Sequence, residues 1–250
     1  MNTAVDYRDD PLEYEVEELA RPDEMLMIKG VRARCREFLN SRTRARVLDL
    51  CCGTGLSLLD VFDHPNVSET IGVDNSESYL SFARVRFADS NVQLILADAI
   101  NPPLDGLFDL IIMSSAYHHI EDTRKGLFLE SSKQFLARSG RIIIGENLLP
   151  PYQVGDAGSY YEAVSSFYQE VLVTARTANP CLPAHVAALI QRVAQYGHDG
   201  DYEYKTSVEI LLGHLAKSSL EIVRSEKYWP TMGPLALTTG GNYVFDVIHA

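Results

Sequence analysis

The chain has 250 residues, of which 46% are hydrophobic and 22% charged, so disordered, collagen-like and coiled-coil structures are disfavoured. Its net charge of −12 opposes contact with a nucleic-acid backbone. No apolar run reaches the ~20 residues that span a bilayer. Residues 1–10 lack the basic and apolar regions of a signal peptide. We expect one cytoplasmic domain over residues 1–250, monomeric or homodimeric, that acts on a small molecule without nucleic-acid or membrane partners.

Cysteine spacing gives no sign of a covalent or metal framework. The four cysteines include one adjacent pair and no Cys-x-x-Cys motif, which argues against a disulfide framework and a zinc site; they are Cys35, Cys51, Cys52 and Cys181. We interpret all four as reduced thiols, mostly buried, and we expect no metal.

The N-terminal part of the chain is acidic and is interrupted by Pro22. It carries Tyr7, Tyr14 and a group of glutamates, and we predict a flexible or lid-like arm over residues 1–24. Apolar residues recur every three or four positions from 25 to 39, which predicts an amphipathic helix.

Short apolar runs then alternate with helical stretches. The pattern predicts strands at residues 47–50, 70–73, 92–96, 108–113 and 141–145, and helices at 56–62, 76–88 and 124–137. Such alternation is typical of parallel strands joined by right-handed crossovers, with helices on both faces of the sheet.

The C-terminal half departs from this alternation. Residues 150–217 read as helices separated by prolines and glycines, with many tyrosines, and we predict a helical cap inserted over the sheet. Strands at 220–224 and 242–248 would follow as an antiparallel pair that closes the sheet.

The most informative motif is the loop Asp49-Leu-Cys-Cys-Gly-Thr-Gly55 after the first strand. Two glycines there let backbone amides approach a ligand at the start of the next helix, although a simple tight turn would also use them. Asp74 ends the second strand, where a carboxylate can accept both hydroxyls of a ribose. Leu58 replaces the third glycine of the dinucleotide motif, which disfavours NAD.

A second carboxylate follows the third strand. Asp98 lies between Ala97 and Ala99, which would leave room for a ring beside it. A lone aspartate is more often a helix cap. At the same sheet edge as Asp74, however, Asp98 can accept the exocyclic amine of adenine.

Together these segments resemble the class I S-adenosylmethionine-dependent methyltransferases. The motifs are Val47-Leu-Asp-Leu-Cys-Cys-Gly-Thr-Gly55, Ile71-Gly-Val-Asp74, Ala97-Asp-Ala99, Phe108-Asp-Leu-Ile-Ile112 and residues 136–144. The resemblance implies an α/β, Rossmann-like fold with a seven-stranded, mostly parallel sheet and an antiparallel terminal strand. It implies S-adenosylmethionine as the cofactor, with its methionine part near Asp49 and Gly53 and its ribose at Asp74. Cys51 departs from the family, which more often has glycine there.

From the motifs and this resemblance we expect a set of cofactor contacts: Tyr14, Asp49, Cys51, Gly53, Gly55, Asp74, Asn75, Asp98, Ala99 and Ser114. The candidate catalytic residues follow the fourth and fifth strands or begin the cap: His118, Glu146, Asn147, Tyr152 and Tyr160. An imidazole can take a proton from a nucleophile, but a buried histidine held by hydrogen bonds is the commoner explanation for His118. Capping or exposure would explain Glu146 and Asn147.

Three functions remain open at this point. The first is methyl transfer to a small-molecule acceptor in secondary metabolism, with positioning as the main source of acceleration. The second follows from a layout that resembles the bacterial azetidine-2-carboxylate synthases, in which the methionine amine of the cofactor attacks its own γ-carbon and expels methylthioadenosine. Glu146 or Asn147 would then bind the ammonium or accept its proton. The third is a noncatalytic adenosyl-binding module.

Overall fold

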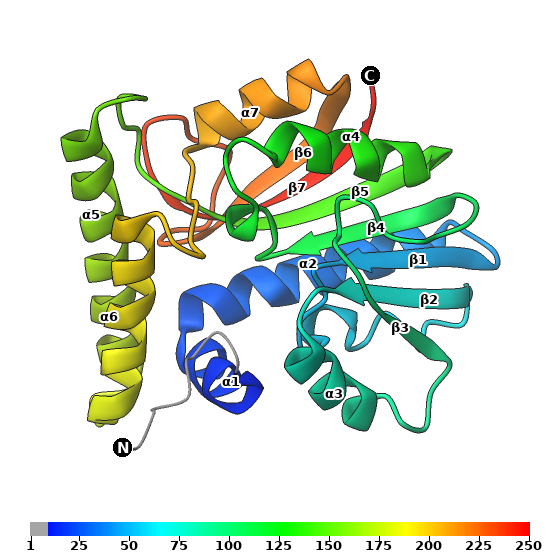
Figure 1. Cartoon of the computed structure of the whole chain (residues 1–250), viewed down its shortest axis with the longest axis horizontal. Helices are drawn as coiled ribbons and strands as arrows, with labels where there is room; N and C mark the ends of the chain where they lie inside the picture. Colours follow the sequence, from blue (N-terminus) through cyan, green and yellow to red (C-terminus); the bar gives the residue numbers. More distant parts are fainter. Residues whose placement is uncertain (1–9) are drawn as a thin grey trace.

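The computed structural model describes residues 10–250, and these form a three-layer α/β structure around one sheet (Figure 1). The seven strands lie in the order β3-β2-β1-β4-β5-β7-β6. Their bounds are β1 Ala45–Leu50, β2 Val67–Asp74, β3 Val92–Leu96, β4 Phe108–Ser114, β5 Leu136–Leu148, β6 Leu220–Trp229 and β7 Gly241–His249. Strands β1 to β5 pair in parallel, and β7 pairs antiparallel with both β5 and β6. The predicted Rossmann-like fold is confirmed.

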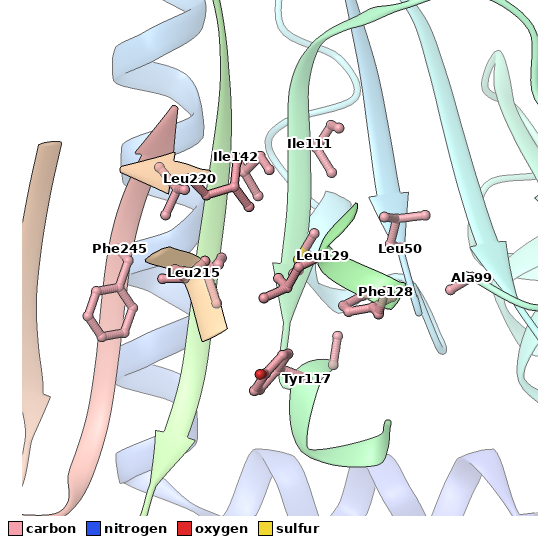
Figure 2. Packing of buried hydrophobic residues seen from close by; sticks show 14 of the residues in the cluster. Leu50, Ala99, Ile111, Tyr117, Phe128, Leu129, Ile142, Leu215, Leu220 and Phe245 are labelled. Carbon is pink, nitrogen blue, oxygen red and sulfur yellow. The ribbon is translucent and has the colours of Figure 1, made fainter. Parts of the chain in front are cut away.

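Helices cover both faces of this sheet because buried side chains alternate along its strands. Leu48 and Leu50 of β1 belong to the core beneath α4 (Lys125–Phe135) and α7 (Val208–Lys217). Val47 faces the opposite core, beneath α2 (Pro22–Asn40) and α3 (Glu77–Arg86). Figure 2 shows the first core, where side chains from α4, α7 and the strands meet.

Two predicted elements differ from the structure. The helix expected over residues 56–62 is only the short 3-10 helix η2 (Leu56–Leu58), because Leu59 is extended and Asp60 has a φ of 64°. The fifth strand continues beyond residue 145, because residues 145–148 pair with the start of β7. Glu146 and Asn147 therefore lie within β5, and the prediction that they follow the strand was wrong.

The cap consists of α5 (Ala157–Ala178) and α6 (Ala184–Asp199), which pack together around their own apolar core. The helix α1 (Pro11–Ala20) lies beside α6, as Figure 1 shows. Helix α7, which falls within the predicted cap insertion, instead packs against α4 and β6 on the sheet.

The described part of the N-terminal arm is ordered helix rather than a flexible segment, because residues 11–20 form α1 and several of its glutamates are buried. Tyr7 lies outside the described residues. Among residues 10–250, no helix is both long enough and apolar enough to cross a membrane.

Candidate active site

A cavity of about 910 Å³ opens at the carboxyl ends of the parallel strands, where open α/β sheets bind their ligands. Its volume lies in the range of small-molecule and cofactor sites, ~300–1,000 Å³. Eight of the predicted cofactor contacts line it: Tyr14, Cys51, Gly53, Asp74, Asn75, Asp98, Ala99 and Ser114. We refer to it below as the cofactor cavity.

The loop after β1 takes its shape from backbone conformations that favour glycine. Gly53 has a φ of 53° and its N–H donates to Asp74 Oδ2 at 2.8 Å. Cys51 has a φ of 61°, in the left-handed region. This conformation favours glycine, and cysteine adopts it here.

Asp74 is a buried carboxylate on the cavity wall. Its Oδ1 accepts from the N–H of Ser76 at 2.9 Å, and each oxygen keeps a further lone pair for a ligand hydroxyl. Burial raises the pKa of Asp74, while the backbone N–H donors of Ser76 and Gly53 oppose that rise.

The two remaining predicted cofactor residues lie behind the cavity wall. Asp49 Oδ2 accepts a hydrogen bond from Ser57, which does line the cavity. Its Oδ1 is buried and has no hydrogen-bond partner among the described residues. Burial raises the pKa of Asp49 to about 7. A Cβ atom on Gly55 would lie 2.3 Å from the Phe87 ring, so this glycine permits the loop to pack closely against α3 and the residue that follows it.

The predicted adenine contact, Asp98, is half exposed at the cavity edge. Its Oδ2 binds Arg124 at 2.6 Å and its Oδ1 accepts from the N–H of Ile100 at 2.9 Å. These contacts fix the carboxylate at the rim of the cavity.

A second, smaller compartment adjoins the cofactor cavity and shares four wall residues with it: Tyr14, Ser115, His119 and Tyr202. Its free volume is about 20 Å³, room for a group the size of one water molecule. The wall comes from α1, the start of α2, the segment after β4, the end of β5 and the cap. Four of its residues are glutamates, Glu17, Glu18, Glu24 and Glu203, and we call it the acidic compartment.

His118 and Glu146 form a buried pair beside this compartment. His118 Nδ1 hydrogen-bonds to Glu146 Oε1, and Glu146 also accepts from the N–H groups of Tyr117 and Asn147 at 3.0 and 2.9 Å. These two N–H donors favour an ionised Glu146 that receives the Nδ1 proton, although burial raises the pKa of this carboxyl. Burial, aided by repulsion from Lys205, lowers the pKa of His118 well below its usual range. The imidazole is thus neutral, with the Nε2 lone pair available as a base.

Asn147 contacts the N-terminal helices. Its Oδ1 accepts from Arg21 at 3.1 Å, and its Nδ2 donates to Glu24 Oε2 at 2.9 Å. Both ends of the amide are therefore engaged. Asn147 lines the acidic compartment and joins the end of β5 to the start of α2.

Glu203, which follows the cap helices, faces both histidines. Its carboxylate lies 3.8 Å from His118 Nε2 and 3.6 Å from His119 Nδ1, and ligand atoms of the three residues lie within 4.8 Å of one another, as in a metal site. Lys205 Nζ lies 2.9 Å from Glu203 Oε2 and already supplies a positive charge. Burial disfavours an ionised Glu203, but Lys205 together with the two histidines outweighs burial and lowers the pKa of that carboxyl to about 2.

Two predicted catalytic residues are not brought to either cavity. Tyr152 and Tyr160 pack against each other, with ring centroids 5.0 Å apart, at the edge of the cap core. The cap tyrosines on the acidic compartment are instead Tyr168 and Tyr202.

Sequence reasoning also missed Arg21, Glu24, Glu203 and Lys205 as site residues. The available signals were an arginine placed among glutamates before Pro22 and the alternating charges of Glu203-Tyr-Lys205.

Comparisons with known proteins indicate a methyltransferase. Residues 47–140 match the family model described as "Methyltransferase domain". The chain is 28% identical over 221 residues to the demethylmenaquinone methyltransferase of Thermotoga maritima, covering 87% of this chain and 84% of that one. It is 33% identical to the enzyme of that name from Staphylococcus saprophyticus, but over only 38% of this chain and 42% of that one.

Solved structures show the same fold at low sequence identity. A S-adenosylmethionine-dependent methyltransferase from Clostridium acetobutylicum superposes with a TM-score of 0.59 and 16% identity, covering 91% of this chain and 92% of that one. The fold and the cavity define an α/β enzyme that binds S-adenosylmethionine. Residues 47–140 are similar to a methyltransferase domain, and the fold is that of class I S-adenosylmethionine-dependent methyltransferases.

The residues around the cofactor cavity fit S-adenosylmethionine. The Oδ1 of Asp49, buried and without a partner within residues 10–250, and the acidic surroundings suit a cationic molecule, and Asp74 suits a ribose.

Proposed function

We propose that this protein transfers a methyl group from S-adenosylmethionine to a small-molecule acceptor of secondary metabolism. The observation that carries the proposal is the buried His118–Glu146 pair beside the acidic compartment, next to the cofactor cavity. Bound S-adenosylmethionine would supply an electrophilic methyl group.

The chain's own residues would prepare the nucleophile. His118 Nε2 accepts the acceptor's proton, and Glu146 fixes the tautomer through Nδ1 and stabilises the imidazolium that forms. Glu203, 3.8 Å from Nε2, adds a negative charge that favours the same state. The cap and α1 exclude water around these groups.

A second candidate is cyclisation of the cofactor itself to azetidine-2-carboxylate, with release of methylthioadenosine. The size of the acidic compartment favours it, because about 20 Å³ leaves no room there for a bulky separate acceptor. In this reaction the proton released to His118 would come from the methionine ammonium.

One experiment separates these candidates. The pure protein is incubated with S-adenosylmethionine, first alone and then with a panel of small acceptors, and the nucleoside product is identified. S-adenosylhomocysteine that forms only when an acceptor is present supports methyl transfer. Methylthioadenosine from the cofactor alone contradicts methyl transfer and supports cyclisation. Tight cofactor binding without turnover in either condition contradicts both reactions.

A further inference from the structure

The wall of the acidic compartment holds more carboxyl groups than basic groups. Glu17, Glu18, Asp23 and Glu24 are all buried around the guanidinium of Arg21. Asp23 Oδ2 and Glu17 Oε1 lie 2.9 and 3.2 Å from Arg21, and Glu24 Oε2 lies at 3.3 Å. One guanidinium therefore faces four carboxylates, in a region where ionised groups are costly unless paired.

Of the four carboxylates, Glu18 lies farthest from Arg21. Its Oε1 lies 3.9 Å from Arg21 Nη1, beyond hydrogen-bond distance, and the side chain is 6% exposed. Its Oε2 is buried without a hydrogen-bond partner among the described residues. Because Glu18 lines the compartment, a donor placed there by a ligand would stabilise this oxygen.

The rest of the wall also suits a small cation. Tyr168 and Tyr202 contribute phenol rings, whose faces attract positive charge. Glu203 keeps a negative charge, and His118 offers a neutral Nε2. The free space of about 20 Å³ matches an ammonium group better than a ring.

We propose that the acidic compartment binds the ammonium group of an amine substrate, with Glu18 as its carboxylate partner and His118 as its proton acceptor. This inference rests on the proposed function and names the substrate class of that site. The ammonium proton moves to His118 Nε2, and the nitrogen lone pair forms a bond to the transferred carbon. The bond from that carbon to sulfur breaks, and sulfur keeps the electron pair. The amine is either a separate small molecule or the α-amine of the cofactor.

The first test uses methylammonium chloride as the probe and the wild-type protein saturated with methylthioadenosine, which lacks the α-amine of the cofactor. We expect calorimetry to show methylammonium binding, and methanol, a neutral molecule of similar size, to bind at least about tenfold more weakly, because hydrogen bonds to charged groups are the stronger ones. Equal binding of the two probes, or binding of neither, would overturn the inference without any variant.

The second test compares two glutamates of the same helix. Glu18→Gln keeps the shape but removes the charge, and we expect it to weaken methylammonium binding about tenfold or more. Glu13→Gln, at an exposed position of α1, should stay within twofold of wild type. Methylthioadenosine affinity reports whether each variant has kept its fold, because this nucleoside has no amine for Glu18 to bind. Unchanged methylammonium binding in Glu18→Gln rejects Glu18 as the partner.

The third test identifies the source of the amine. Methylthioadenosine formed from the cofactor alone, and inhibited by methylammonium, assigns the α-amine of the cofactor. S-adenosylhomocysteine formed with small primary amines assigns a separate acceptor. If Glu18→Gln methylates a hydroxyl acceptor at the wild-type rate, the ammonium inference fails and methyl transfer stands. If methylammonium binds but no acceptor is methylated, methyl transfer fails and the ammonium site stands.

Discussion

Arg86 at the end of α3 binds Glu15 of α1 through both guanidinium Nη atoms, at 2.6 and 2.8 Å. Arg86 Nη1 also donates to the carbonyl of Thr54, a residue on the wall of the cofactor cavity, at 2.7 Å. Tyr14, next to Glu15, packs against Tyr79 of α3 with ring centroids 5.2 Å apart. Helix α1 is thereby joined to α3 beside the cofactor site.

Breaking this ion pair should loosen α1. We expect Arg86→Gln and Glu15→Gln each to raise the KM for S-adenosylmethionine and to speed amide hydrogen exchange over residues 11–20. The double variant should resemble either single one, with a coupling energy of about 1 kcal/mol because the two groups are in contact. The exposed pair Arg224–Glu37, which does not line the cofactor cavity, is the matched control and should show no measurable coupling. Additive effects at Arg86 and Glu15 would show that the pair does not act as a unit.

Removing the carboxylate behind His118 should slow the chemical step. Glu146→Gln retains the size of the side chain but no longer stabilises the imidazolium, and we expect kcat to fall about 10²- to 10⁴-fold, the usual contribution of general acid–base catalysis. The dissociation constant for S-adenosylmethionine should change little, since Glu146 does not line the cofactor cavity. Steady-state kinetics with equilibrium binding checks this, and Glu221→Gln on the exposed side of β6 is the control. A wild-type kcat in Glu146→Gln would remove the pair from the mechanism.

Asp74 should dominate cofactor affinity. Asp74→Ala removes the acceptor for the ribose and leaves the Gly53 N–H without its partner, so we expect binding of S-adenosylmethionine to weaken by about ten- to a hundredfold. Asp89→Asn, at an exposed site after α3, should leave affinity unchanged. Calorimetric titration measures both variants. Wild-type affinity in Asp74→Ala would contradict the ribose assignment.

Asp49 should make cofactor binding depend on pH. Because burial raises its pKa to about 7, this carboxyl is protonated below that pH in the free protein and ionised above it. A bound cation favours the ionised form, so binding should release a proton near pH 7, and affinity should increase as the pH rises through 7. The folding stability of the free protein depends on pH in the opposite direction, because the folded state holds the Asp49 proton more tightly than the unfolded chain does. Stability from this group is therefore gained as the pH falls through 7.

Titration in buffers of different ionisation enthalpy measures the released proton. Asp49→Asn cannot ionise, so the proton release and the rise in affinity near pH 7 should both disappear. Their persistence in that variant would assign the titration to another group.

The sheet and the cofactor loop could be predicted from sequence because their signals are local. Each parallel strand is a short apolar run, and the residues of the cofactor site follow those runs directly, as Gly53 and Asp74 do. The helix after Leu56 was overpredicted because apolar spacing there did not reveal the left-handed Asp60. The continuation of β5 through Asn147 was missed because it depends on pairing with β7, far along the chain.

The acidic compartment could not be predicted for a different physical reason. Glutamates in a run normally lie on a solvated surface, whereas Glu17 and Glu18 are buried by the cap and face Arg21. Glu203 meets His118 only once the cap has packed, and nothing in their separate segments indicates the contact. Tyr152 and Tyr160 show the opposite error. Both were predicted as site residues, but they pack into the cap core.

The place of β7 between β5 and β6 also governs when the site can form during synthesis. Glu146 and Asn147 pair with Tyr243 and Asn242, which the ribosome adds long after it has completed the cofactor loop. A nascent chain that has reached the cap already contains every predicted cofactor contact, but the strand carrying Glu146 still lacks a neighbour on one side. The acidic compartment is therefore expected to be the last part of the molecule to become ordered, and premature termination before β7 would leave a chain without the His118–Glu146 pair in place.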